Sequence, residues 1–201
     1  MTIIIVKSGL MADDSREKMI LGAIRLLATS GLEGLSFSTV LELTRAPRGS
    51  IYHHFPQGKD QLIQLALERA GELLLTSMEL SPRAAAKDVA EHFFGIWRRV
   101  LLDSNFQTGS AVGAVTVATR DPILLKHARA VFHSWRDCLA QQLTRGGLPP
   151  DRANVMALAM ITAVEGAIVL CRAAHCIEPL EAATTPLLSE INGLVSRRQP
   201  R

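Results

Sequence analysis

The chain has 201 residues and a formal net charge of +3, which suits one large domain or two small ones. Hydrophobic residues make up 48% of the chain but aromatic residues only 4%. This balance favours helices packed on helices over a β-sandwich, and the slight positive charge permits nucleic-acid binding without requiring it.

The start of the chain differs from a secretion signal. Its apolar run, residues 2–6, is too short for the hydrophobic region of such a signal, and a second methionine follows at Met11. We therefore expect residues 1–10 to be an upstream extension or a disordered arm. The cysteine count of three is odd, which without a leader is typical of a reducing compartment. We expect a cytoplasmic protein.

Short helices are predicted over the first third of the chain. Apolar spacing predicts a helix over residues 14–30, and Gly31 is a stop signal. Ser36 is the predicted N-cap of "FSTVLELT". Pro47 biases its predecessor away from helix, so the chain turns there, and Pro47 then falls in the first turn of a third helix, "RGSIYHHF". A fourth helix follows from Lys59 to about Met78. Short helices joined by a tight turn form a helix-turn-helix pattern.

Longer helices are predicted for the rest of the chain, and no strand is. The expected ranges are 81–103, 111–119, 121–143, 151–174 with Asp151 as N-cap, and about 180–195. The segment 155–171 is nearly all apolar, but a membrane span needs about 20 such residues, and Glu165 interrupts it. We expect a buried or interface helix and no membrane contact.

The stretch "APRGSIYHHFPQGK" carries the candidate nucleic-acid chemistry, because no acid lies between Arg45 and Lys59. A helix that enters the major groove needs a slim N-terminal end, which small residues provide, and its backbone amides attract phosphate. Basic side chains would add phosphate contacts, and polar ones could reach phosphates or base edges. The candidates are Arg45, Pro47, Arg48, Gly49, Ser50, Tyr52, His53 and Lys59, with Ile51 and Phe55 facing the core.

A plain polar surface is the alternative for this stretch. Residues 11–60 contain six basic and six acidic side chains, so the N-terminal region as a whole has no net charge. Composition alone leaves both interpretations open.

The segment from residue 18 to about 66, with "GSIYHHF" followed by Lys59, resembles the N-terminal domain of TetR-family transcriptional regulators. The spelling "APRGSIYHHFPQGK" and the later "GSAVGAV" look most like the LmrA/YxaF-type subgroup. The resemblance implies an all-α protein with an N-terminal extension and DNA-binding domain over residues 1–58 and a ligand-binding and dimerisation domain over 59–201. It also implies a homodimer that represses transcription and is released from a double-stranded operator by a small molecule. Operator roles are implied for Ser36, Arg48, Gly49, Ser50, Tyr52, His53 and Lys59.

This chain departs from the family pattern at three places. Arg45 stands where the turn usually has glycine, so it strains the turn or contacts phosphate itself. Leu35 stands where threonine is common, which removes a possible phosphate-binding hydroxyl. Ser110 and Ala111 stand where the subgroup often carries Cys-Pro.

Two sets of C-terminal residues are candidates for ligand binding and dimerisation. The first would together line a mostly apolar pocket, for a planar aromatic molecule, although each member alone is better explained as core. It comprises Phe93, Trp97, Phe106, Phe132, Trp135 and Met160. The second lies on the last two helices, whose apolar stripe needs a partner to bury it. It comprises Val155, Leu158, Thr162, Leu187, Leu188, Ile191 and Leu194.

Metal and enzyme chemistry are the rival classes. Cys171, His175 and Cys176 could form part of a metal site, but no fourth ligand is evident and the spacing matches no common zinc pattern. No Ser/His/acid set, phosphate loop or paired carboxylates stand out. We expect no enzyme activity, metal or cofactor. The alternatives that stay open are a transcriptional activator, a repressor with a protein or redox signal, and a small-molecule-binding enzyme on an all-helical fold.

Overall fold

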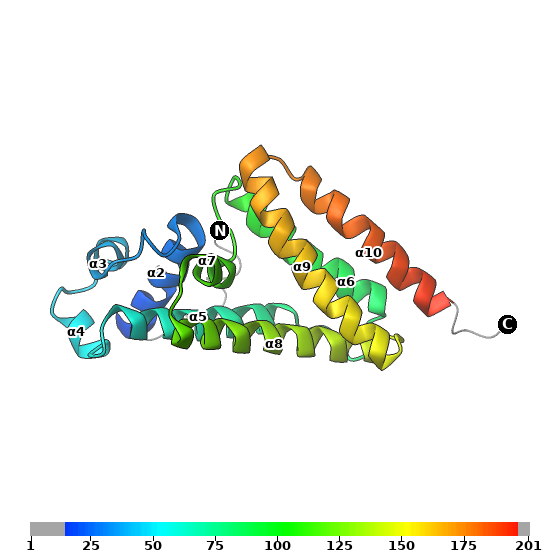
Figure 1. Cartoon of the computed structure of the whole chain (residues 1–201), viewed down its shortest axis with the longest axis horizontal. Helices are drawn as coiled ribbons and strands as arrows, with labels where there is room; N and C mark the ends of the chain where they lie inside the picture. The colour runs from blue at the N-terminus through cyan, green and yellow to red at the C-terminus, as the bar shows by residue number, and fades with distance from the viewer. Residues whose placement is uncertain (1–14, 197–201) are drawn as a thin grey trace. The chain divides into compact units, whose positions relative to one another are not determined.

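The computed structural model describes residues 15–196. This part of the chain folds into helices α2 to α10 without a β-strand, which confirms the all-helical fold class (Figure 1). The expected extension at residues 1–10 lies outside the described residues. The described residues group into two compact units: one holds those up to Leu74 together with Thr108–Phe132, and the other holds Leu75–Gln107 together with those from His133 onward.

The first unit is built around α2, which contacts α3, α4 and α7. At Gly22 of α2 an added Cβ would lie 2.6 Å from Thr44 Cγ2, so the missing side chain lets α2 and α3 pack closely. Arg69 of α5 donates to Glu17 of α2 at 2.7 Å, and this hydrogen bond raises the pKa of the Arg69 guanidinium. The helices of this unit are α2 (Ser15–Ser30), α3 (Phe37–Thr44), α4 (Ser50–His54), most of α5 (Lys59–Ser77), α7 (Ala111–Ala118) and the start of α8 (Pro122–Arg145).

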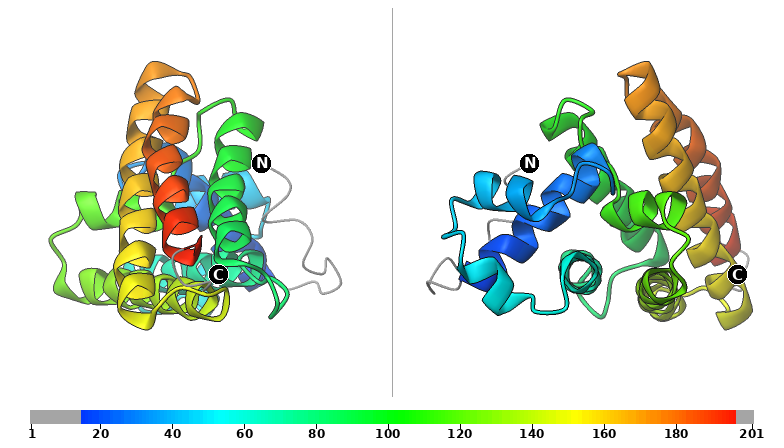
Figure 2. Two further views of the ribbon diagram at one scale, coloured as in Figure 1. Left: turned by 90° about the vertical axis from the view of Figure 1, so that its right-hand side faces the viewer. Right: turned by 60° about the vertical axis from the view of Figure 1, so that its left-hand side comes forward.

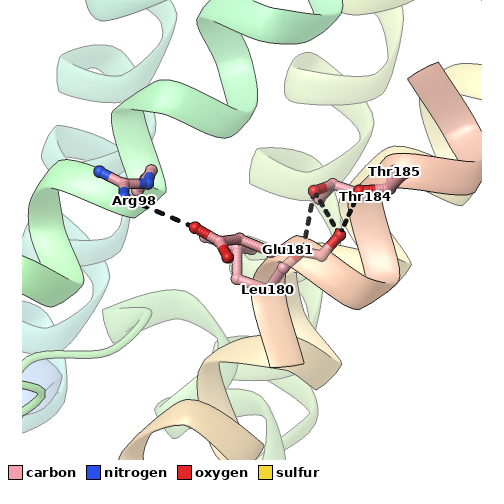
Figure 3. A network of polar contacts seen from close by, with 5 residues as sticks. All are labelled: Arg98, Leu180, Glu181, Thr184 and Thr185. Atoms are coloured by element: carbon pink, nitrogen blue, oxygen red, sulfur yellow. Dashed lines mark hydrogen bonds and ion pairs between the residues drawn. The ribbon is translucent and has the colours of Figure 1, made fainter. Parts of the chain in front are cut away.

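The second unit packs three long helices together: α6 (Ala86–Asp103), α9 (Pro150–Ala174) and α10 (Glu178–Ser196). In both views of Figure 2, α9 and α10 run side by side, and α6 contacts both. An ion pair between Arg98 Nη2 and Glu181 Oε1, 3.5 Å apart, joins α6 to α10 (Figure 3). The remainder of α8 completes the unit.

Helix starts are the main departures from the sequence predictions. The helix expected from residue 81 begins at Ala86, whose amide donates to the Gly146 carbonyl at 3.0 Å. The prediction that Asp151 caps α9 is wrong, because Pro149 is the N-cap and Asp151 lies in the first turn. A proline at the first helical position already has the backbone φ that a helix needs.

The compact units divide the chain differently from the functional division at residues 58 and 59. α5 begins at Lys59, yet its residues up to Leu74 cluster with the helix-turn-helix region. The division into residues 1–58 and 59–201 concerns function, and it stays a prediction.

Candidate nucleic-acid interface

Ser36 holds the start of α3 through a reciprocal cap. Its Oγ accepts a hydrogen bond from the Thr39 amide at 3.1 Å, and Thr39 Oγ1 accepts one from the Ser36 amide at 2.9 Å. The predicted N-cap is confirmed, with Thr39 as its partner. Ser36 thus has a structural role in the fold, and its contact with DNA stays a prediction.

The turn after α3 contains Arg45 in the left-handed conformation, with φ 54° and ψ 29°. A side chain makes this conformation less favourable by about 1–2 kcal/mol, which is why glycine is the usual residue there. Arg45 is exposed, so core packing does not compensate for the strain. The strained turn predicted for Arg45 is therefore confirmed, and the chain keeps a cation where glycine would fit better.

The short helix α4 begins at Ser50 rather than at Arg48, which corrects the predicted start. The Ser50 amide and Oγ both donate to the Pro47 carbonyl, at 3.1 and 2.6 Å, so Pro47 closes a turn ahead of the helix instead of forming its first turn. Ile51 and Phe55 are 0% and 1% exposed. Their predicted role as core anchors of α4 is confirmed.

The outer side of α4 presents Tyr52 and His53 to solvent. Tyr52 is 67% exposed, and its ring meets the Phe37 ring of α3 edge-on with 5.5 Å between centroids. This contact orients the Tyr52 ring while leaving most of the side chain accessible. Arg48 and Pro47 are exposed just before the helix.

Gly49 is not required by the fold of a single chain. Its φ of −73° and ψ of −25° are ordinary helical values that any residue adopts. A Cβ built on Gly49 would have no other heavy atom within 4 Å. The space over the N-terminal end of α4 is therefore open to the close approach of another molecule.

Lys59 is the exposed first residue of α5. The turn before it contains Gly58 with φ 86° and is closed by Gln61 Oε1, which accepts from the Gln57 amide at 3.0 Å. The amides at this helix start attract anions, as does the Lys59 side chain. The candidate residues therefore occupy the start of α3, the continuous segment 45–53, and the start of α5.

The predicted pocket residues are spread over both units. Phe93, Trp97, Trp135 and Met160 are buried in the second unit, at 1%, 7%, 3% and 0% exposure. Phe106 is half-buried there, whereas the half-buried Phe132 ends a segment of the first unit. Burial does not distinguish a core residue from a residue that lines a pocket, so the pocket stays a prediction.

The thiols at the end of α9 belong to its C-terminal turn. The Cys176 amide donates to the Cys171 carbonyl at 3.3 Å, and burial raises the pKa of the Cys171 thiol. The His175 ring lies 5.1 Å from the Phe106 ring. Among residues 15–196, no group of three or more His, Cys, Asp or Glu side chains could hold a metal ion.

α9 exposes an apolar face opposite its buried one. Val155 and Leu158 are 63% and 56% exposed and share a helix face with the exposed Thr162, while Val169 and Leu170 are 65% and 59% exposed further along. Within the described range α9 is also the one helix long and apolar enough to cross a membrane. Its other face packs against α6 and α10, as in the core of a helical domain.

The predicted dimer residues of α10 are less exposed than those of α9. Leu187, Leu188 and Leu194 are half-buried, and Ile191 is 0% exposed. A side chain that one chain buries completely is unavailable to a second chain. Ile191 therefore packs within its own chain, and its place among the interface residues stays a prediction.

Family models match both halves of the chain. Residues 20–66 match the bacterial regulatory proteins of the tetR family, and residues 86–185 match the C-terminal domain of LmrA/YxaF-like transcriptional regulators. The chain is 33% identical over 174 residues to the HTH-type transcriptional regulator Rv0196 of Mycobacterium tuberculosis (strain H37Rv), which covers 83% of this chain and 88% of that one. This chain belongs to the TetR family of transcriptional regulators. It is also 26% identical to the HTH-type transcriptional regulator LmrA of Bacillus subtilis, over 83% of this chain and 91% of LmrA.

Solved TetR structures share the fold. The chain superimposes on the regulatory protein TetR from Rhodobacter sphaeroides with a TM-score of 0.77 at 22% identity, covering 87% of this chain and 97% of that one. A TetR transcriptional regulator from Chloroflexus aurantiacus gives a TM-score of 0.71 at 27% identity over 90% and 96% of the two chains. The expected family, subgroup and DNA-binding character are confirmed by these matches and by the two family models.

Two features of this TetR protein escaped the sequence prediction. Leu35, at the position where the family commonly has threonine, is 1% exposed and belongs to the core rather than to a phosphate-facing surface. The Gly109 amide donates to the Ala28 carbonyl at 2.8 Å, so the segment before α7 is hydrogen-bonded to the end of α2. No local sequence pattern indicates such a contact between residues so far apart in the chain.

Proposed function

We propose that this TetR-family regulator is a cytoplasmic repressor that binds a palindromic operator as a homodimer and is released by a small, mostly apolar effector. Family membership supplies the DNA-binding regulator. The homodimer, the palindrome, the repression and the effector are the added claims. The open space at Gly49 supports the DNA contact, and the exposed apolar face of α9 supports the homodimer.

The DNA contact is proposed for the segment 45–53 and for Lys59. Ile51 and Phe55 anchor the buried side of α4 in the core. Its exposed side would offer the phenol of Tyr52 and the imidazole of His53 to the groove. Gly49 would let the phosphate backbone come close to the start of α4 without meeting a side chain. Arg45, Arg48 and Lys59 would neutralise phosphates, which fix the register of the protein on DNA.

The homodimer is proposed to form through α9 and α10. A row of large apolar side chains at Val155, Leu158 and Val169 is exposed in the single chain. A second copy would remove this surface from water, which is the dominant favourable contribution in most protein association. The two copies would then present two α4 helices to half-sites related by a two-fold axis, and this arrangement requires a palindrome.

Effector release is proposed to use α7. The LmrA/YxaF-like C-terminal match includes α7, and α7 packs on α2 of the DNA-binding region. The Gly109–Ala28 hydrogen bond adds a direct link to α2. An effector that binds better when α7 has shifted would thereby bias α2 and the helices that α2 supports. A coupling of about 1–3 kcal/mol changes affinity for DNA roughly 5- to 150-fold.

The substitution Gly49→Ala tests the interface, with Gly95→Ala as its matched control. Both glycines have room for a methyl group, since a Cβ at Gly49 would have no neighbour within 4 Å and one at Gly95 would meet only Arg99 Nη1 at 4.0 Å. We expect both variants to keep or slightly raise the melting temperature. Loss of a close phosphate contact should weaken DNA binding by Gly49→Ala about 10-fold per subunit, because a hydrogen bond to a charged group contributes about 1.5 kcal/mol or more.

Fluorescence anisotropy with a labelled duplex, beside a melting curve, separates the outcomes. Unchanged DNA affinity in a folded Gly49→Ala protein would contradict the close approach at the start of α4. An equal loss in Gly95→Ala would show that the effect does not come from the DNA interface.

A further inference from the structure

The indole of Trp97 is an exception among the buried polar groups of the second unit. Trp97 is only 7% exposed, and its Nε1 is buried without a hydrogen-bond partner. Buried donors are paired in the great majority of native structures, since an unpaired one loses its bonds to water without compensation. The Trp97 N–H is therefore a buried donor for which the described chain supplies no acceptor.

The polar residues buried in the described chain, Ser110, Gln142 and Thr184, have partners. Ser110 Oγ accepts from the Gly113 amide at 3.0 Å, and Thr184 Oγ1 donates to the Leu180 carbonyl at 2.8 Å (Figure 3). The other unpartnered atom, Ser15 Oγ, lies at the first described residue, beside chain that the structure does not describe. Trp97 thus stands apart within a well-satisfied helical core.

The neighbours of Trp97 on the buried face of α6 are apolar. It lies one turn after Phe93, which is 1% exposed and whose ring is 5.9 Å from that of Phe94. α6 packs here against α9 and α10, and the next residue, Arg98, reaches Glu181 through an ion pair whose two side chains are about half exposed (Figure 3). Such an exposed pair holds α6 to α10 only weakly. Apolar side chains of α6 therefore make the main contribution to this packing.

The charge of the ligand follows from the buried residues. No charged side chain is among the buried residues of the described chain, whose buried polar members are Ser110, Gln142 and Thr184. A buried carboxylate or ammonium on the ligand would have no buried counter-charge and would be strongly disfavoured. A neutral oxygen acceptor meets the N–H without this penalty.

We propose that Trp97 Nε1 donates a hydrogen bond to the carbonyl oxygen of a neutral, otherwise apolar effector. The inference rests on the proposed function, because it assigns an acceptor group to the effector that releases the protein from DNA. It uses residues of the second unit only, within the segment that matches the LmrA/YxaF-like C-terminal domain.

Two probes of equal size test the hydrogen bond: acetophenone, and ethylbenzene, which lacks the carbonyl oxygen. The chain has two tryptophans, so ¹H–¹⁵N spectra of the full-length protein contain two indole signals, which Trp97→Phe assigns. We expect acetophenone to move the Trp97 signal downfield with little effect on Trp135. It should bind about 2- to 10-fold more tightly than ethylbenzene, the ratio that one net hydrogen bond supplies. Trp97→Phe should abolish this preference.

Several results would overturn the inference. Equal binding of the two probes, or a Trp97 signal that neither probe moves at millimolar concentration, would refute a hydrogen bond from Trp97 to the ligand's carbonyl oxygen. A water-to-indole cross-peak that persists with acetophenone would show a buried water only. If Trp97→Phe does not fold, Trp135→Phe supplies the assignment, and the wild-type titration still decides.

DNA binding in the presence of each probe separates this inference from the proposed function. A Trp97 shift with unchanged DNA affinity would support the binding site and count against release by this ligand. Loss of DNA affinity without a Trp97 shift would support release and refute the role of Trp97.

Discussion

Replacing Arg45 with glycine tests the turn and the phosphate contact in one protein. Arg45 has φ 54°, and relief of the left-handed strain should stabilise the fold by about 1–2 kcal/mol. Glycine also makes the unfolded chain more flexible, which offsets about 0.5–1 kcal/mol. The net gain is about 0.5–1 kcal/mol, or roughly 1–4 °C in melting temperature for a chain of this size.

The same substitution removes one cation from the proposed interface. Each phosphate contact contributes about 0.9 to the slope of log K against log salt concentration, so Arg45→Gly should lower the slope by about one unit per subunit. Arg45→Ala is the matched variant, because it removes the cation and keeps the strain. We expect both variants to lose the same slope and only Arg45→Gly to gain stability.

Melting curves and anisotropy titrations between 50 and 200 mM salt, about the range where such contacts matter, provide the two readouts. An unchanged salt slope in both variants would refute a phosphate contact by Arg45. Equal melting temperatures for Arg45→Gly and Arg45→Ala would refute the account of the turn.

Two further substitutions test the dimer and the core. Leu158→Glu should dissociate the protein into monomers in sedimentation experiments at micromolar concentration, because a dimer would bury the new charge. The control Ile123→Glu should leave the oligomeric state unchanged, since Ile123 is 55% exposed against 56% for Leu158. A monomeric wild type would contradict the dimer. Gly146→Ala should destabilise the fold by about 1–3 kcal/mol, because its Cβ would lie 2.4 Å from the Ala86 backbone nitrogen. A melting temperature equal to that of Gly95→Ala would show that the backbone around Gly146 and Ala86 moves apart without cost.

Local patterns predicted the helices well, because the apolar spacing and stop signals lie within each segment. Gly31, for example, follows α2 with φ 70°, as a glycine stop signal implies. The start of α6 was misplaced because the partner of its first amide, the Gly146 carbonyl, comes from a distant part of the chain.

The candidate DNA-binding residues were predicted only where local helix geometry determines their exposure. Tyr52 and His53 follow from helix geometry once Ile51 and Phe55 are assigned to the core. The open space at Gly49 and the unpartnered Trp97 N–H depend on what surrounds each residue in three dimensions. Spacing could not show that Ile191 is buried by its own chain, since an apolar stripe fits a core and an interface equally well.

Selection of DNA from a random duplex library tests the central claim most directly. The purified full-length protein is incubated with the library, and the retained duplexes are sequenced. A homodimer that presents two α4 helices predicts an enriched motif of two inverted half-sites whose centres are about 10 base pairs apart, or a multiple of that distance. Enrichment of a single asymmetric half-site, or of no sequence at all, would contradict the account.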